Sequence, residues 1–148
     1  MCLLKSQNIN LNPSLIKNKY NARKGKGTMS QLESCCKRLL EEANIPFEYE
    51  GIEYELVPKV TYSSFEKSRK NFKEIKTTRA VIYRPDFICP NRTWIIETKG
   101  FKTPDFVIKW KLLKQRLYNE NKNIVLFMPT NKKQIECSIE LIKRMQSQ

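Results

Sequence analysis

Apolar residues recur at helical spacing in separate stretches of the chain, and each stretch predicts a helix. The first stretch begins at Ser30, and Pro46 closes it because proline cannot continue a helix. The same spacing returns in a stretch that begins at Thr103 or Pro104 and in another that begins at about Asn131. In each case the apolar positions would share one face of the helix, so the pattern predicts amphipathic helices that pack on a common core.

Segments of alternating or continuous apolar residues predict strands between these helices. The candidate strands are residues 47–50, 52–56, 80–83 continuing into 87–89, 94–99 and 124–128. The last of these is wholly apolar, which is typical of a strand at the centre of a sheet. The order of elements predicts an α/β fold, in which helices flank a mixed β-sheet.

The charge of the chain is strongly unbalanced, with 28 lysines and arginines against 15 aspartates and glutamates and a net charge of +13. A basic domain attracts polyanions, and nucleic acid is the one that it meets most often. An anionic membrane is the alternative, but no apolar segment approaches the roughly 20 residues of a spanning helix. Residues 1–4 are also too short for the apolar part of a signal peptide. We therefore expect a nucleic-acid partner and no membrane association.

The chain contains five cysteines and no histidine. The absence of histidine excludes a Ser-His-Asp or Cys-His mechanism and the usual structural zinc sites. The cysteines show no metal-binding spacing, which favours reduced thiols in a cytoplasmic compartment. Acid–base or metal chemistry would therefore depend on carboxylates, lysines, tyrosines or backbone groups.

Two segments carry much of the positive charge. Residues 1–28 have no acidic residue and are interpreted as a flexible basic arm that precedes a domain over residues 29–148. Residues 59–84 combine basic residues with interleaved aromatic residues, and a protruding hairpin or a loop insertion is expected there. Tyr62, Phe65 and Phe72 could stack on unpaired bases or form a small satellite core.

The candidate chemistry lies in two short motifs that a turn separates. Glu97 and Lys99 are two positions apart on a predicted strand, so their side chains share one face. An antiparallel pairing through the turn after Cys89 would bring Asp86 opposite Glu97. The two carboxylates and the peptide carbonyl of Thr98 would then converge, which is a ligand set that magnesium prefers. Lys99 could orient a water molecule or stabilise the negative charge of a phosphodiester under attack.

Alternatives to this interpretation apply to each motif alone. An aspartate after proline is often a turn residue, and a glutamate and a lysine two apart often form a solvated salt bridge. Paired carboxylates also occur in glycosidases, but that reading explains neither Lys99 nor the net charge.

Pro85-Asp86 followed by Glu97-Thr98-Lys99 resembles the PD-(D/E)XK nuclease superfamily. More narrowly, the chain is similar to the phage endonuclease I family of Holliday junction resolvases. The matching segments are residues 30–33, 45–50, 83–87 and 96–100, within a resemblance over roughly residues 29–128. The resemblance implies a restriction-endonuclease-like fold. Together with the Asn- and Lys-rich composition it suggests a protein of phage or mobile-element origin that acts in a bacterial cytoplasm.

The resemblance also implies a role for each site residue. Asp86 and Glu97 would be metal ligands and Lys99 would orient the water. Glu33 would supply a further carboxylate, so that two ions per site are possible. Residues 30–33 also read as a helix-capping box, and Glu33 could simply pair with Lys37. Mg²⁺ is the expected cofactor, with Mn²⁺ able to substitute.

We therefore predict a magnesium-dependent endodeoxyribonuclease, active on branched DNA and dimeric. The predicted DNA-contacting residues are Lys102, Arg84, Arg79, Lys70, Arg69, Lys76, Arg23 and Lys24. Residues 59–84 are longer than the corresponding connection in the family, and they could bridge two subunits or grip DNA from a monomer. The alternatives are a sequence- or mismatch-directed nicking enzyme, a general phage nuclease of the same superfamily, and a DNA-binding module without catalytic activity.

Overall fold

The computed structural model describes residues 29–67 and 72–147. Its helices are α2 (Gln31–Glu42), α3 (Pro104–Asn119) and α4 (Lys132–Gln146). Its strands are β1 (Glu48–Tyr49), β2 (Tyr54–Val57), β3 (Thr61–Lys67), β4 (Phe72–Thr77), β5 (Val81–Tyr83), β6 (Phe87–Ile88), β7 (Trp94–Ile96) and β8 (Val125–Phe127). The protein thus has the mixed α/β fold that the apolar pattern predicts.

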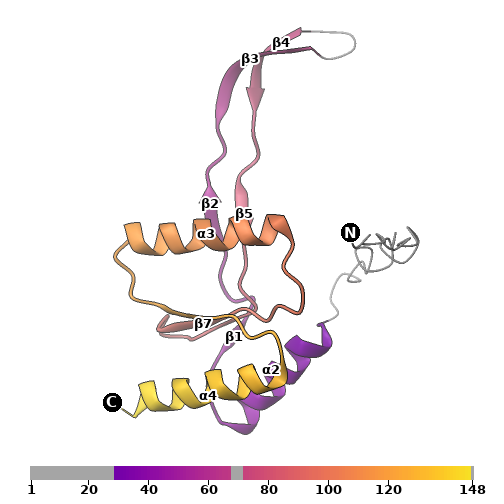
Figure 1. Ribbon diagram of the computed structural model, residues 1–148. Helices are drawn as coiled ribbons and strands as arrows, with labels where there is room; N and C mark the ends of the chain where they lie inside the picture. The colour runs from indigo at the N-terminus through magenta and orange to yellow at the C-terminus, as the bar shows by residue number, and fades with distance from the viewer. Residues whose placement is uncertain (1–28, 68–71, 148) are drawn as a thin grey trace, which may run out of the picture. The chain divides into compact units, whose positions relative to one another are not determined.

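A four-stranded sheet in the order β1-β6-β7-β8 forms the middle layer. β6 pairs antiparallel with both β1 and β7, whereas β8 runs parallel to β7. The parallel pair needs a crossover, and α3 provides it between β7 and β8. α3 lies on one side of the sheet, and α2 and α4 lie on the other (Figure 1).

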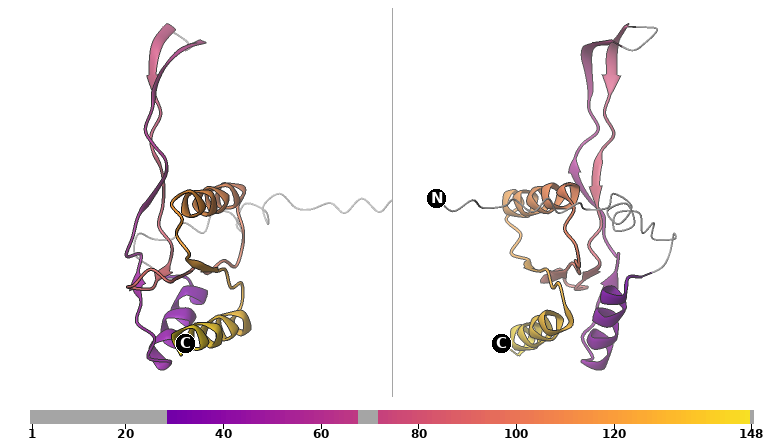
Figure 2. Two further views of the ribbon diagram at one scale, coloured as in Figure 1. Left: turned by 90° about the vertical axis from the view of Figure 1, so that its left-hand side faces the viewer. Right: turned by 45° about the vertical axis from the view of Figure 1, so that its right-hand side comes forward.

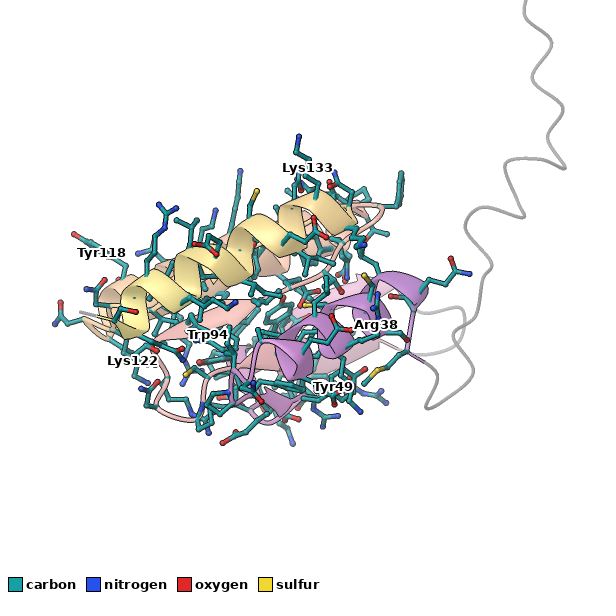
Figure 3. All side chains as sticks on the ribbon, turned by 90° about the horizontal axis from the view of Figure 1, so that it is seen from below. Arg38, Tyr49, Trp94, Tyr118, Lys122 and Lys133 are labelled. Atoms are coloured by element: carbon teal, nitrogen blue, oxygen red, sulfur yellow. The ribbon has the colours of Figure 1, made fainter. Side chains whose placement is uncertain are left out.

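Alternation along the strands of this sheet divides the core into two halves. Phe87 and Ile96 face α2 and α4, where they join Cys36, Leu40, Ile135 and Ile142. Their neighbours Ile88 and Ile95 face the other way. Figure 3 looks onto the first of these faces, where α2 and α4 cover the sheet with Trp94 beneath them. All of these side chains are buried, so helices cover both faces of the sheet.

The second half of the core is rich in aromatic side chains. Tyr54 and Tyr83 are register partners in the β2–β5 pair, and both belong to one buried cluster with Phe106 and Trp110 of α3 and with Ile88 and Ile95. β2 and β5 then lead directly into the β3–β4 hairpin, which Figure 2 shows from two sides. The basic segment 59–84 therefore contains a two-stranded hairpin whose base is attached to the α3 side of the core.

Side-chain caps place the starts of the second and third predicted helices. Thr103 Oγ1 accepts a hydrogen bond from the Phe106 amide at 3.2 Å, and Pro104 occupies the first turn. Asn131 Oδ1 accepts from the Gln134 amide at 3.0 Å. Each cap satisfies an amide that the helix itself leaves unbonded. The expected starts of α3 and α4 are confirmed.

The expected continuous strand through residues 80–89 is wrong. β5 pairs with β2, whereas β6 pairs with β1 and β7, so the two segments belong to different sheets. Pro85 lies between them, and proline lacks the amide that a continuous ladder would need. The break matters because Asp86 lies at this junction.

Two other strand predictions need correction. β7 ends at Ile96 rather than at Lys99, although the amides of Glu97 and Lys99 still donate to the carbonyls of Phe127 and Pro129. β8 lies at the edge of its sheet rather than at the centre, and Val125 is 39% exposed. A short apolar segment does not distinguish the two positions, because the partner strand lies elsewhere in the sequence.

Candidate functional site

Asp86 and Glu97 meet at the junction where β6 begins and β7 ends. The antiparallel register pairs Phe87 with Ile96, so Asp86 comes opposite Glu97. The Asp86 amide donates a hydrogen bond to Glu97 Oε2 at 3.3 Å. Both side chains are buried, with 9% and 3% of their surface exposed. The pairing that the sequence predicts for these two acids is therefore found.

Thr98 fixes the Asp86 carboxylate. Its amide and its hydroxyl both donate to Oδ2 of Asp86, at 2.8 and 2.7 Å. From the sequence, only the backbone carbonyl of Thr98 was expected at this site, because Thr98 lies between the two site residues Glu97 and Lys99. Two donors on one oxygen orient the carboxyl group and leave Oδ1 outside this interaction.

Lys99 completes the expected trio. Its Nζ lies 3.1 Å from Glu97 Oε1, so the two side chains do share one face. The same Nζ lies 4.4 Å from the centroid of the Phe106 ring, on α3. A carboxylate and an aromatic face both attract an ammonium group, and together they hold Lys99 at the site. The side chain remains 30% exposed, which leaves it accessible to a substrate.

The electrostatics of the site are dominated by negative charge in a buried position. Burial raises the pKa of Asp86 to about 7, the charge of Glu97 adds to this, and that of Glu33 contributes less. Hydrogen bonds from Thr98 act in the opposite direction, because they favour the ionised carboxylate. A carboxyl group with such a pKa would gain from a bound cation, which would compensate the charge.

Glu33 approaches the site from α2. It is buried, and one of its oxygens accepts a hydrogen bond from the Tyr49 hydroxyl of β1 at 3.3 Å. Burial and the charge of Glu33 raise the pKa of Tyr49 to about 12. Burial, followed by the charge of Asp86, also raises the pKa of Cys36 to about 12. The first turns of α2 thus border the acidic pair, and Tyr49 is a neighbour that the sequence did not reveal.

Two carboxylates, rather than three, are gathered at the centre of the site. Within residues 29–67 and 72–147, no three acidic or cysteine side chains form a group that could hold a metal ion. Mg²⁺ is commonly held by one or two carboxylates, and its remaining positions are taken by water and substrate phosphates. Asp86 and Glu97 fit such an ion. Both are buried, and the positive charge beside them is too small to prevent the raised pKa of Asp86.

Tyr83 is a further neighbour that the sequence reasoning missed. The ring is buried, and in the part of the chain that the structure describes its hydroxyl has no hydrogen-bond partner. Burial raises the pKa of Tyr83, and the Glu97 carboxylate and Asp86 add to this. The tyrosine ends β5, just before the Pro85-Asp86 motif, but nothing in the sequence indicates which way its hydroxyl points.

The predicted DNA-contacting residues do not form one uniform group. Arg79 and Lys102 are exposed, and Lys76 is half-buried. Arg84 is bound to Glu53, with Nε 2.6 Å from Oε2. The others, Arg23, Lys24, Arg69 and Lys70, lie outside the described residues, as does the predicted basic arm over residues 1–28.

Comparisons with protein-family models, curated proteins and solved structures returned no match for this chain. None of the helices described here has the length and apolar character needed to cross a membrane. The cysteines in the described residues, Cys35, Cys36, Cys89 and Cys137, are free thiols.

Proposed function

We propose that this protein is a magnesium-dependent endodeoxyribonuclease of the PD-(D/E)XK type, with a restriction-endonuclease-like fold. The observation that carries the proposal is the buried contact between Asp86 and Glu97, with Lys99 held 3.1 Å from Glu97. Acidic pairs of this kind, next to a lysine and in a strongly basic chain, suit the hydrolysis of a phosphodiester.

Each residue has a distinct task in this proposal. Asp86 and Glu97 would hold the ion, and Thr98 keeps the Asp86 carboxylate in place. A divalent ion there would lower the pKa of water and neutralise charge on the phosphodiester. Lys99 would orient the attacking water and stabilise negative charge on the phosphate oxygens. Glu33, whose charge reaches Asp86, is the proposed ligand for a second ion.

The substrate class follows from the charge. A net charge of +13 favours a polyanion, and exposed Arg79 and Lys102 are available for phosphate contacts. We propose DNA, and branched DNA in particular, cut by a dimer in which two sites act on one junction. The cytoplasm of a bacterial host is the proposed location.

The direct test is a cleavage assay. Wild-type protein, Asp86→Asn and Glu97→Gln are incubated with a four-way junction, a flap and a linear duplex, with Mg²⁺ or with EDTA. We expect Mg²⁺-dependent cuts by the wild type and losses of at least about 10²-fold for either variant. If correctly folded protein cuts none of these substrates, the proposal of an enzyme is wrong. The non-catalytic DNA-binding module would then be the remaining hypothesis.

The pattern of substrates separates the alternatives within the superfamily. Preference for the junction, together with a dimer in light scattering, supports a resolvase. Cuts in linear duplex by a monomer would instead support a nicking enzyme or a general nuclease. Full activity of Asp86→Asn would place the chemistry at another site even if the protein is a nuclease.

A further inference from the structure

The Tyr83 hydroxyl is buried beside the proposed metal ligands and makes no hydrogen bond to any of the described residues. A buried hydroxyl without a partner destabilises the folded state, so such groups are uncommon without a functional reason. Phenylalanine would fill the same space without this cost. The hydroxyl is therefore the feature of Tyr83 that needs an explanation.

The direction of the ring is set by its packing. Tyr83 contacts Trp110 edge-on, with 6.2 Å between ring centroids, and lies 6.5 Å from Phe106. Phe106 and Trp110 are themselves stacked at 5.9 Å, and Phe106 also supports the Lys99 ammonium. One aromatic cluster on α3 thus holds both Tyr83 and Lys99, so the tyrosine cannot turn its hydroxyl elsewhere without repacking the core.

The site residue that acts most strongly on this hydroxyl is Glu97, whose carboxylate contributes more to the raised pKa of Tyr83 than Asp86 does. The two groups nevertheless do not reach the geometry of a formed hydrogen bond. In this structure Glu97 is instead engaged by the Asp86 amide and by Lys99.

Binding of a metal ion would change the hydrogen bonds that hold the Glu97 carboxylate. An ion would coordinate the same Glu97 oxygens that now accept from the Asp86 amide and from Lys99. Carboxylates that bind metals are in turn held by hydrogen bonds from neighbouring side chains, which fix their orientation. The Tyr83 hydroxyl is a donor within the same buried cluster that has no other task.

We infer that Tyr83 is a positioning residue of the proposed nuclease site, whose hydroxyl donates a hydrogen bond to the Glu97 carboxylate when Glu97 turns to bind a divalent ion. This inference rests on the proposed function. Tyr83 acts through Glu97 and is not assigned a contact with the DNA or with the attacking water.

The test compares metal binding by two tyrosine variants of the full chain. Tyr83→Phe removes the hydroxyl and keeps the ring. Tyr54→Phe is the matched control, because Tyr54 is the register partner of Tyr83, is equally buried and lies in the same core. Its ring lies 5.8 Å from Arg116 Cζ, and no acid of the site contributes to the raised pKa of Tyr54.

Titration calorimetry with MnCl₂ measures binding without any cleavage. We expect the Mn²⁺ dissociation constant of Tyr83→Phe to rise about 10- to 100-fold and that of Tyr54→Phe to stay near the wild-type value. Without metal, the melting temperature of Tyr83→Phe should be unchanged or higher, because no hydrogen bond is lost. In cleavage assays the Mg²⁺ concentration for half-maximal rate should rise, and saturating Mg²⁺ should restore most of the rate.

Other outcomes overturn the inference in distinguishable ways. If wild type and Tyr83→Phe bind Mn²⁺ equally well, Tyr83 has no positioning role and the proposed function stands. An equal loss of affinity in both variants would assign the effect to the core rather than to the Tyr83 hydroxyl. If the wild type binds no Mn²⁺, the proposed metal site is wrong and the inference fails with it.

Discussion

The backbone amide of Asp86 donates a hydrogen bond to the Glu97 side chain, across a turn that separates the two residues by 11 positions. This contact depends on the β6–β7 register, in which Phe87 opposes Ile96. A slip of one residue would turn one of the two side chains to the other face of the sheet. The two acids therefore meet only in the observed register, and the buried pair that results has consequences that can be measured.

The first prediction concerns stability. The pKa of Asp86 is raised from 3.8 to about 7 in the folded protein, so the folded state binds a proton more tightly than the unfolded state does. The contribution of this group to stability falls as pH rises from about 4 to about 7. Asp86→Asn lacks the buried charge and should be more stable than wild type at pH 8 in EDTA, on the order of a few kcal/mol.

Urea denaturation at several pH values measures this difference. The gap between Asp86→Asn and wild type should narrow as the pH falls toward 4, where Asp86 is protonated in the folded state and begins to be protonated in the unfolded state. Glu136→Gln, on the outer part of α4 and already exposed, serves as a control and should show no such gap. A gap of the same size at pH 4 and pH 8 would contradict a titrating Asp86.

The second prediction concerns the pH dependence of metal binding. An ion must displace the proton from Asp86, whose pKa is about 7. The apparent affinity for Mn²⁺ should therefore be nearly constant above pH 8 and fall by about tenfold for each pH unit below 7. Calorimetry in two buffers of different ionisation enthalpy should also detect proton release at pH 6. Affinity that does not change between pH 6 and 8 would argue against Asp86 as a ligand.

The third prediction concerns the support of Lys99. Its ammonium lies over the Phe106 ring, and such contacts contribute about 1 kcal/mol. Phe106→Leu should lower kcat up to about tenfold with little change in KM for DNA. Lys99→Met should lower kcat further, by at least about 10²-fold.

A core control is needed, because Phe106 is also buried. Leu113→Val loses volume in the same core of α3 without removing a ring next to Lys99. If Leu113→Val reduces kcat as much as Phe106→Leu does, the effect of Phe106 is on packing and not on Lys99.

The fourth prediction concerns DNA contacts. Arg79 is exposed close to the base of the hairpin, and Arg79→Gln should weaken DNA binding and reduce the slope of log K against log salt by about 1. Lys133→Gln removes the same charge from α4, where Figure 3 shows the side chain pointing outward. The two variants have equal net charge, so equal salt slopes would exclude a specific phosphate contact at Arg79.

Local features of the sequence were sufficient for several parts of the fold. The caps at Thr103 and Asn131 place α3 and α4, because a cap is formed by residues three positions apart. The meeting of Asp86 and Glu97 was also predictable, since one short turn joins their strands. Side-chain alternation then placed Lys99 beside Glu97.

The tertiary structure determined those contacts and strand pairings whose partners are distant in the sequence. It placed Phe106 under Lys99, Tyr49 on Glu33 and the Tyr83 ring against Trp110. It also assigned β5 and β6 to different sheets and β8 to an edge. Periodicity specifies which face of an element is buried but not which element will cover it, because that choice depends on packing between distant segments. The acidic pair and Lys99 can therefore be recognised in the sequence, whereas the side chains that hold them in place are determined by the packing of α2 and α3 around the sheet.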